Sequence, residues 1–201
     1  MKKTFISIII FLSSSLFLTS TSFSQQKFDE GIDYKKIGSS QKSNTSGKIE
    51  VIEFFWFGCP HCKNFYPALK KWAENKPSYV KYTKLHVPFR DINHQRLYFT
   101  IREMGLTDKL IPKIFVVIQE NTRPLNNLLS ILDWLEDQNI NTSDFEEKWN
   151  SESVKNSMEK ATKLMKKFKI TGVPQIVVDG TYLTSPAMVG GSHRRAINVI
   201  D

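Results

Sequence analysis

Both cysteines of this 201-residue chain lie within one four-residue motif, Cys59-Pro60-His61-Cys62, directly after a strongly apolar segment. Residues three apart in a helix share one face, so a helix that begins at this motif brings the two thiols within bonding reach. Pro60 suits the first position of such a helix, because proline has no backbone N–H to leave unpaired. A two-cysteine chain cannot be a disulfide-stapled mini-protein or hold a four-cysteine zinc site. The motif therefore favours an α/β fold with thiol chemistry where a strand meets a helix.

The two thiols should differ in reactivity. Cys59 would lie at the helix N-terminus, where free backbone N–H groups and the helix dipole favour a thiolate. Cys62 would lie inside the first turn, where it is more covered and ionises less readily. We therefore expect Cys59 to be the nucleophile and Cys62 the resolving thiol. Two other readings stay open: an inert disulfide, which would close too short a loop to stabilise the chain much, and a metal site shared with His61.

The two residues between the cysteines should set the redox poise. A protonated His61 near Cys59 would favour the thiolate, whereas an exposed loop histidine would have no such effect. A stabilised thiolate stabilises the reduced protein and makes its disulfide more oxidising. Each unit by which the pKa of Cys59 falls is about 1.4 kcal/mol, or about 30 mV for a two-electron couple.

The apolar pattern predicts the order strand, helix, strand, helical block, helix, hairpin, helix. The predicted strands cover 48–57, 79–87, 173–178 and 181–183, with a short possible one at 34–37. The predicted helices cover 60–74, 92–104, 110–118, 128–135, a short helix opened by a Ser143/Glu146 capping box, 154–168 and 193–200. We expect a kink or restart at Pro112, a helix stop at Gly172 and a tight turn at Asp179-Gly180.

This order is the thioredoxin plan with an inserted helical domain, an α/β fold. We divide the chain into a signal peptide at 1–24, a first thioredoxin-like part at 25–87, a helical insertion at 88–160 and a second thioredoxin-like part at 161–201.

The N-terminus has the layout of a secretory signal peptide. Lys2 and Lys3 precede an apolar stretch at 5–12, and small residues precede a cleavage point before Gln25. The alternative is a retained membrane anchor, although many Ser and Thr in its second half make a poor bilayer span. Export argues against a nucleic-acid partner, despite a formal net charge of +8.

Four further residues are candidate site residues. Glu53 interrupts an apolar strand, and a buried carboxylate requires a partner or a proton. Lys84 lies in the next strand, so a Glu53–Lys84 pair below the cysteines could relay protons to Cys62; in the alternative, both side chains extend to solvent. Pro174 opens a strand and could follow a cis bond, which would turn the Val173 main chain toward a substrate. An ordinary trans proline is the alternative. His86, His94 and His193 are expected to be structural or surface residues.

Several segments resemble the DsbA-type periplasmic thiol:disulfide oxidoreductases. EFFWFGCPHC at 53–62 is similar to the active-site segment of that family, with an acid six residues before the first cysteine. VKYTKLHVPF at 80–89 is similar to its second strand, which gives Lys84 the position of a buried lysine. FEEKWN at 145–150 and GVPQIVVDGTYLTSP at 172–186 resemble its later helix and its cis-proline hairpin.

The resemblance implies an oxidase that donates its Cys59–Cys62 disulfide to reduced exported proteins in the periplasm. It implies mixed disulfides through Cys59, reoxidation by a quinone-linked membrane partner of the DsbB kind, and no cofactor other than the redox-active disulfide. We expect a monomer without a metal. An isomerase or reductase of the same fold is the nearest alternative, although the short segment after Gln25 leaves little room for the N-terminal dimerisation module of the isomerases. A peptide-binding chaperone or a metal carrier is an alternative of another class.

Overall fold

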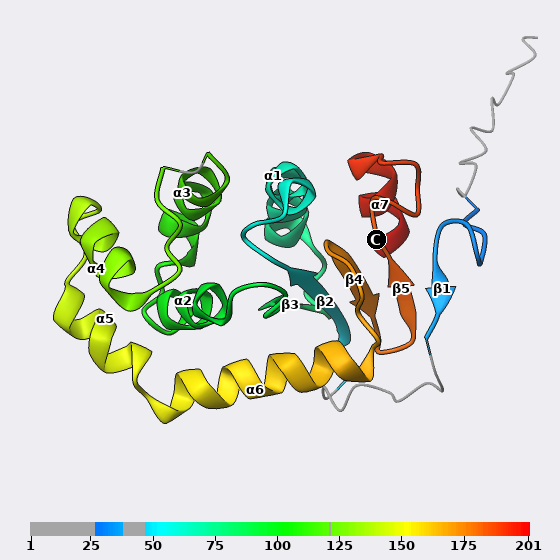
Figure 1. The fold of residues 1–201 in the computed structure, drawn as a ribbon. Helices are drawn as coiled ribbons and strands as arrows, with labels where there is room; N and C mark the ends of the chain where they lie inside the picture. Colours follow the sequence, from blue (N-terminus) through cyan, green and yellow to red (C-terminus); the bar gives the residue numbers. More distant parts are fainter. Residues whose placement is uncertain (1–26, 38–46, 121) are drawn as a thin grey trace, which may run out of the picture.

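The computed structural model describes residues 27–37, 47–120 and 122–201, so the predicted signal peptide lies outside the described residues. The strands are β1 (Lys35–Lys36), β2 (Ile49–Phe55), β3 (Val80–His86), β4 (Gln175–Val178) and β5 (Tyr182–Thr184). The helices are α1 (Pro60–Asn75), α2 (Ile92–Glu103), α3 (Thr107–Gln119), α4 (Leu128–Asp137), α5 (Thr142–Trp149), α6 (Glu152–Lys167) and α7 (His193–Ile200). The mixed sheet and helices form the predicted thioredoxin-like α/β fold (Figure 1).

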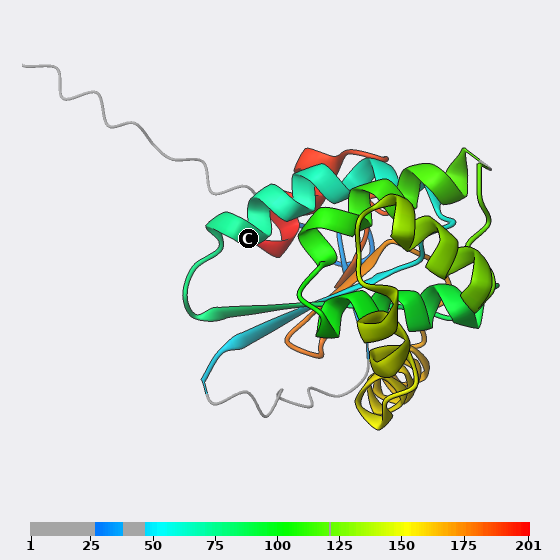
Figure 2. The ribbon, with the colours of Figure 1, turned by 90° about the vertical axis from the view of Figure 1, so that its left-hand side faces the viewer.

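The strands form one sheet in the order β1-β5-β4-β2-β3. Only β2 and β3 are parallel; β4 pairs antiparallel with β2, and β5 pairs antiparallel with β4 and β1. The helices α1 and α7 cover one face of the sheet and α6 runs across the other (Figures 1 and 2). This two-sided cover explains why β2 is apolar at every position from Val51 to Phe55 except Glu53, since all five residues are buried.

β2 ends two residues earlier than its apolar run predicts. After Phe55 the chain leaves the ladder, and the Cys59 N–H donates to the Trp56 carbonyl (3.0 Å) in a turn that leads into α1. Gly58 lies at this turn with the Trp56 indole packed against it. A Cβ on Gly58 would lie 2.2 Å from the Trp56 ring, so only glycine fits without moving the indole.

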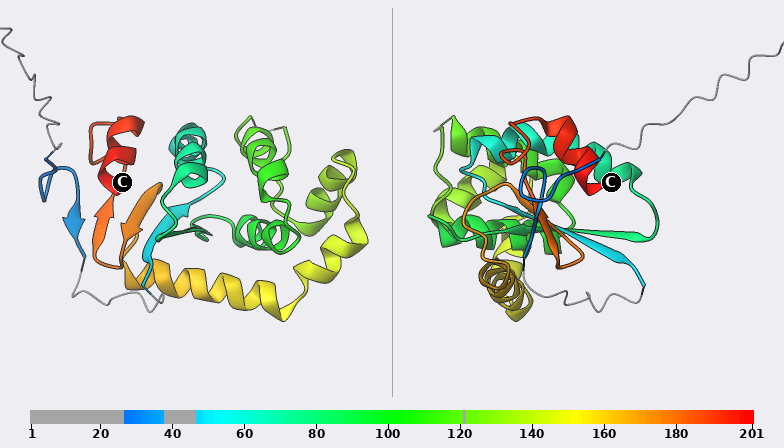
Figure 3. Two further views of the ribbon diagram at one scale, coloured as in Figure 1. Left: turned by 180° about the vertical axis from the view of Figure 1, so that it is seen from behind. Right: turned by 90° about the vertical axis from the view of Figure 1, so that its right-hand side faces the viewer.

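The helical block α2–α5 packs beside the sheet, and α6 leads from it back to β4 (Figure 3). The ring of Phe115 on α3 packs against the rings of Tyr66 on α1 and Phe57 next to β2, with centroid separations of 5.9 and 5.4 Å. On the opposite face, Phe54 of β2 contacts Phe168 at the end of α6 (6.2 Å). The predicted boundary between 160 and 161 falls inside α6, so no break in secondary structure marks it.

Two local predictions are wrong, and a third is wrong in one of its two forms. Pro112 lies inside α3, so the helix does not restart there, and the kink stays a prediction. The short helix is capped by Asn141, whose side chain accepts from the N–H groups of Ser143 and Asp144, and no Ser143/Glu146 capping box forms. The long helix ends at Lys167, before Gly172, because Lys169 takes the left-handed conformation (φ 52°) at the position where helices commonly end.

The predicted hairpin turn and the predicted terminal helix are confirmed. Asp179 and Gly180 both have positive φ (48° and 62°), as a type I′ turn requires, and the Thr181 N–H donates to the Val178 carbonyl (3.0 Å). The terminal helix α7 covers the predicted residues. No helix in the described part of the chain is long and apolar enough to cross a membrane.

A candidate thiol–disulfide site at the start of α1

Cys59 is the N-cap residue of α1, and Pro60 occupies the first helical position. The backbone of Cys59 is extended, and its sulfur accepts from the Cys62 N–H (3.4 Å). The Cys59 carbonyl in turn accepts from the N–H groups of Cys62 (3.1 Å) and Lys63 (3.2 Å). The nucleophile candidate therefore faces the unpaired N–H groups of a helix N-terminus, as predicted.

The surroundings separate the two thiols electrostatically. A hydrogen bond from Cys62, the backbone N–H groups of the first turn and the charge of His61 lower the pKa of Cys59 to about 6, although burial opposes this. Burial raises the pKa of Cys62 far above that of an ordinary thiol, and the contact with Cys59 adds to the rise. Only 1 % of Cys62 is exposed, against 7 % of Cys59. Cys59 is thus the thiol that ionises.

Pro60 and His61 are both exposed beside Cys59. His61 lines a groove of about 250 Å³ together with the Val173–Pro174 segment and the loop at Ser185 and Pro186. His61 therefore lies at the molecular surface beside this groove.

The structure brings Val173 and Pro174 to the cysteine pair across more than a hundred residues of sequence. The Val173–Pro174 bond is cis, and the Cys59 thiol donates to the Val173 carbonyl (3.2 Å). The predicted cis bond and its position opposite Cys59 are therefore confirmed.

Glu53 and Lys84 form a buried ion pair. They are opposite each other in the register of β2 and β3, and the Lys84 Nζ lies 3.2 Å from the Glu53 Oε2. The Glu53 side chain is 2 % exposed and that of Lys84 11 %, so the alternative in which both extend to solvent is wrong. The ammonium of Lys84 also lies over the rings of Phe55 and Tyr66 (4.7 and 4.4 Å).

Tyr82 is a partner of this pair that the sequence analysis did not identify. Its hydroxyl donates to the Glu53 carboxylate, and burial next to that carboxylate raises the pKa of Tyr82 well above its usual value. Tyr82 lies two residues before Lys84 and therefore on the same face of β3. That spacing was visible in the sequence, but only the register with β2 shows that Glu53 lies between them.

The described part of the chain contains no group of three or more His, Cys, Asp or Glu side chains placed to hold a metal ion. The three other histidines have structural contacts of their own. His86 is fully buried, and His94 lies next to the Pro124 carbonyl (2.8 Å). His193 packs against the ring of Phe65 on α1 (5.2 Å).

A helix-capping thiol with a depressed pKa, a buried second thiol three residues on and a cis-proline segment against the first sulfur define a thioredoxin-fold thiol:disulfide oxidoreductase. The family described as DSBA-like thioredoxin domain matches residues 90–196. The chain belongs to this DsbA family. It is an enzyme of thiol–disulfide exchange.

Relatives and solved structures agree over most of the chain. The thiol:disulfide interchange protein DsbA of Burkholderia cepacia is 36% identical over 160 residues, which cover 78% of this chain and 76% of that protein. DsbA of Pseudomonas syringae is 32% identical over 171 residues, 84% of this chain and 80% of that protein. The crystal structure of Pseudomonas aeruginosa DsbA superposes with a TM-score of 0.80 at 30% identity and covers 86% of this chain and 90% of that one.

Proposed function

We propose that this enzyme is an oxidase that transfers the Cys59–Cys62 disulfide to pairs of thiols in reduced exported proteins. A substrate thiolate attacks the Cys59 sulfur, the Cys59–Cys62 bond breaks, and Cys62 leaves as a thiolate that takes up a proton. The second substrate thiolate then attacks the substrate sulfur of the mixed disulfide, and Cys59 leaves as a thiolate. The substrate gains a disulfide, and two electrons remain on the enzyme as two reduced cysteines.

The position of Cys59 at the N-cap carries this proposal. In the second step Cys59 is the leaving group, and a thiol of low pKa leaves faster. The backbone N–H groups of α1 stabilise the Cys59 thiolate, so they favour the reduced enzyme and make its disulfide a stronger oxidant. The exposed ring of His61 adds positive charge beside the same sulfur when it is protonated.

The Val173 main chain is proposed to pair with an extended substrate segment. Its carbonyl already accepts a hydrogen bond from Cys59, so a strand that pairs with Val173 would hold its own sulfur beside Cys59. The groove beside Pro174 and His61 offers room for the neighbouring substrate side chains.

Variants that trap the intermediate test the assignment of the two cysteines. Cys62→Ser whose Cys59 has first been converted to a mixed disulfide with thionitrobenzoate should accumulate a mixed disulfide with a single-thiol substrate peptide. The peptide thiolate displaces thionitrobenzoate, and neither Cys62 nor a second substrate thiol remains to release the peptide. Cys59→Ser treated in the same way should accumulate none, because its remaining thiol is buried. Mixed disulfides are counted on non-reducing gels and identified by mass spectrometry. Accumulation in Cys59→Ser alone would reverse the assignment.

The reduction potential separates the oxidase from its alternatives. An oxidase should have a potential near or above about −180 mV, whereas a reductase should lie near −270 mV. Equilibration of the wild-type enzyme with glutathione buffers gives this value. An isomerase or reductase would be indicated by a potential in the lower range, and a peptide-binding chaperone by binding that persists in a variant lacking both cysteines.

We propose that Glu53 and Lys84 relay the proton that Cys62 takes up. Burial disfavours the Cys62 thiolate, so a nearby acid is needed when the disulfide opens. Glu53→Gln keeps the shape of the side chain and removes its titrating group. It should slow the opening of the enzyme disulfide by about tenfold and flatten its pH dependence, measured by stopped-flow tryptophan fluorescence with a thiol peptide. An unchanged rate and pH profile would exclude the relay.

The cellular setting completes the proposal. We propose that the enzyme acts in the periplasm after export by its N-terminal signal, as a monomer, and that a quinone-linked membrane partner of the DsbB kind reoxidises it. The redox-active disulfide is then its only redox group. The division into thioredoxin-like parts at 25–87 and 161–201 and a helical insertion at 88–160 remains a prediction.

A further inference from the structure

The loop between β2 and α1 is held from two sides by side chains that the reaction as described does not use. The Phe57 N–H donates to the Nε2 atom of His86 (3.1 Å), at the end of β3. The Phe57 carbonyl accepts from the Nε2 amide of Gln119 (2.8 Å), the last residue of α3. The same amide group donates to the carbonyl of Cys59 (3.0 Å).

The hydrogen bond between His86 and Phe57 lies in the core of the protein. His86 and Phe57 are both fully buried, and the His86 ring packs against the rings of Phe55 (5.0 Å) and Phe57 (4.9 Å). Because its Nε2 accepts a hydrogen bond from an N–H group, the neutral ring carries its proton on Nδ1. Burial holds the pKa of His86 well below its usual value, so this acceptor persists at neutral pH.

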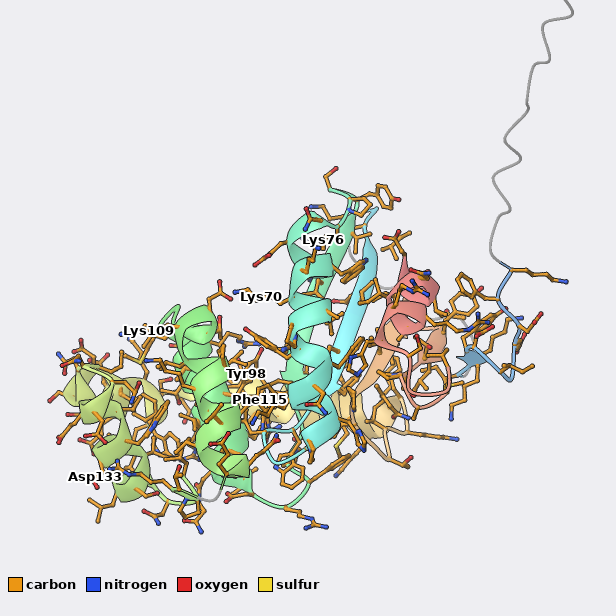
Figure 4. The ribbon with its side chains drawn as sticks, turned by 90° about the horizontal axis from the view of Figure 1, so that it is seen from above. Lys70, Lys76, Tyr98, Lys109, Phe115 and Asp133 are labelled. Carbon is orange, nitrogen blue, oxygen red and sulfur yellow. The ribbon has the colours of Figure 1, made fainter. Side chains whose placement is uncertain are left out.

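The hydrogen bonds from Gln119 link this loop to α3, a helix of the helical block. Phe115, one turn earlier on α3, anchors that helix against Tyr66 of α1, and Figure 4 shows α1 and α3 side by side with Phe115 between them. Both hydrogens of the Gln119 amide have an acceptor, one on each side of Gly58. A single side chain of α3 therefore binds the Phe57–Gly58 and Cys59–Pro60 peptide groups, one before and one after the nucleophile.

We infer that Gln119 is a positioning residue through which the helical block sets the reactivity of Cys59. The Cys59 carbonyl is the N-cap acceptor of α1, so its orientation fixes how the Cys62 N–H points at the Cys59 sulfur. With the Gln119 amide in place, the Cys62 N–H stays directed at the Cys59 thiolate. Without it, the peptide at Cys59 can turn, and the thiolate loses part of its stabilisation. This inference rests on the proposed function only in taking Cys59 as the reactive thiol.

Two substitutions at Gln119 separate the hydrogen bonds from packing. Gln119→Met has a similar length and no amide donor. Gln119→Glu has nearly the same shape, loses both donors and places a carboxylate against two carbonyl oxygens. The matched control is Gln138→Glu, which makes the same charge change at a half-buried glutamine whose side-chain oxygen instead accepts from Lys113 (2.7 Å).

Two readouts would not respond to a merely structural role. The first is the ionisation of Cys59 in the reduced enzyme, followed by thiolate absorbance between pH 3 and 9. The second is the equilibrium constant of the Cys59–Cys62 disulfide with glutathione. We expect Gln119→Met, which loses both hydrogen bonds, to reduce the Cys59 ionisation constant and the oxidising equilibrium constant about threefold. Gln119→Glu loses the same hydrogen bonds and adds a carboxylate near the thiolate, so we expect a reduction of about tenfold. Gln138→Glu should change neither by more than about twofold.

The inference would be overturned if both constants, for Cys59 ionisation and for equilibrium with glutathione, stay within twofold of the wild type in Gln119→Met and Gln119→Glu. This holds also if both variants lose thermal stability. If Gln119→Glu does not fold, Gln119→Met decides alone, since methionine is compatible with a helix end and a half-buried position. A wild-type enzyme that is not oxidising would contradict the proposed function. The comparison of Cys59 ionisation between variants would still test Gln119.

Discussion

The two cysteines at the start of α1 differ in acid strength, and their positions relative to the helix end contribute to this difference. Cys59 precedes the first helical residue and meets N–H groups that have no partner within the helix. Cys62 is three residues further on and is buried against the core. A hydrogen bond from the Cys62 thiol and the N–H groups of the first turn lower the pKa of Cys59, whereas burial raises the pKa of Cys62.

This difference makes the stability of the reduced enzyme depend on pH. The folded pKa of Cys59 is about 6, below the value of about 8.5 for an unfolded thiol. The thiolate therefore stabilises the reduced fold fully above about pH 8.5, and this stability is lost as the pH falls toward 6. Denaturant unfolding of the reduced and oxidised forms at pH 5, 7 and 8.5 measures this contribution to the unfolding free energy. The gap in unfolding free energy in favour of the reduced form should widen with pH, and a constant gap would contradict the ionisation of Cys59.

At the scale of single elements, a side chain caps the start of every described helix except α3. Asp91, Asn127, Asn141 and Ser151 each precede a helix and accept a backbone N–H from its first turn. At α5 the pattern of Ser143 and Glu146 suggested a capping box, yet Asn141 lies two residues earlier and accepts from the N–H groups of Ser143 (3.0 Å) and Asp144 (3.3 Å). Two cap candidates competed, and the earlier one binds the free N–H groups.

Substitution at α5 distinguishes the two caps. Asn141→Ala should lower the free energy of unfolding by about 1 kcal/mol, because it leaves two N–H groups of the first turn without an acceptor. Glu146→Ala is the control and should change the unfolding free energy by less than about 0.5 kcal/mol, since an exposed side chain without a capping role contributes little. Both values come from urea denaturation. A larger effect at Glu146 than at Asn141 would restore the capping box.

On the scale of the whole molecule, the segment at 27–37 is attached to the far edge of the sheet by α7. The Asp33 carboxylate accepts two hydrogen bonds from Arg195 (2.7 and 2.8 Å), and these contacts lower the pKa of Asp33. The Asp33 carbonyl accepts from the Thr184 hydroxyl (2.7 Å). Tyr34 packs edge-on against Tyr182 of β5 (5.6 Å). A two-residue strand, β1, is too short to hold this segment by its ladder alone.

Removal of the Arg195 guanidinium should therefore release the segment at 27–37 from the sheet. Arg195→Met keeps an apolar stem and leaves the buried carboxylate of Asp33 without its partner. We expect trypsin to cut after Lys35 or Lys36 at least about tenfold faster than in the wild type, because local opening exposes these bonds. Arg194→Met is the control, since it removes the same charge from an exposed position of the same helix. Equal cleavage rates in Arg195→Met and the wild type would show that other contacts hold the segment.

Features that depend on neighbours along the chain could be predicted from the sequence. The thiol motif at a helix start, the buried strand before it, the apolar stripes of the helices and the turn at Asp179-Gly180 all follow from spacings of a few residues. Helix ends were less certain, as Lys169 and Asn141 show, because several residues in one stretch could have ended or capped the helix.

Which distant residues meet at the site depends on how the segments pack and could not be predicted from local spacing. Val173 reaches Cys59 because β4 pairs with β2 on the side away from β3, an order that no local spacing specifies. Tyr82 meets Glu53 through the register of β2 and β3, and Gln119 reaches the loop before Cys59 only because α3 packs beside α1. Local spacing reports the conformation of a segment. Contacts between segments depend on how the sheet and the core are packed, and that is a property of the whole chain.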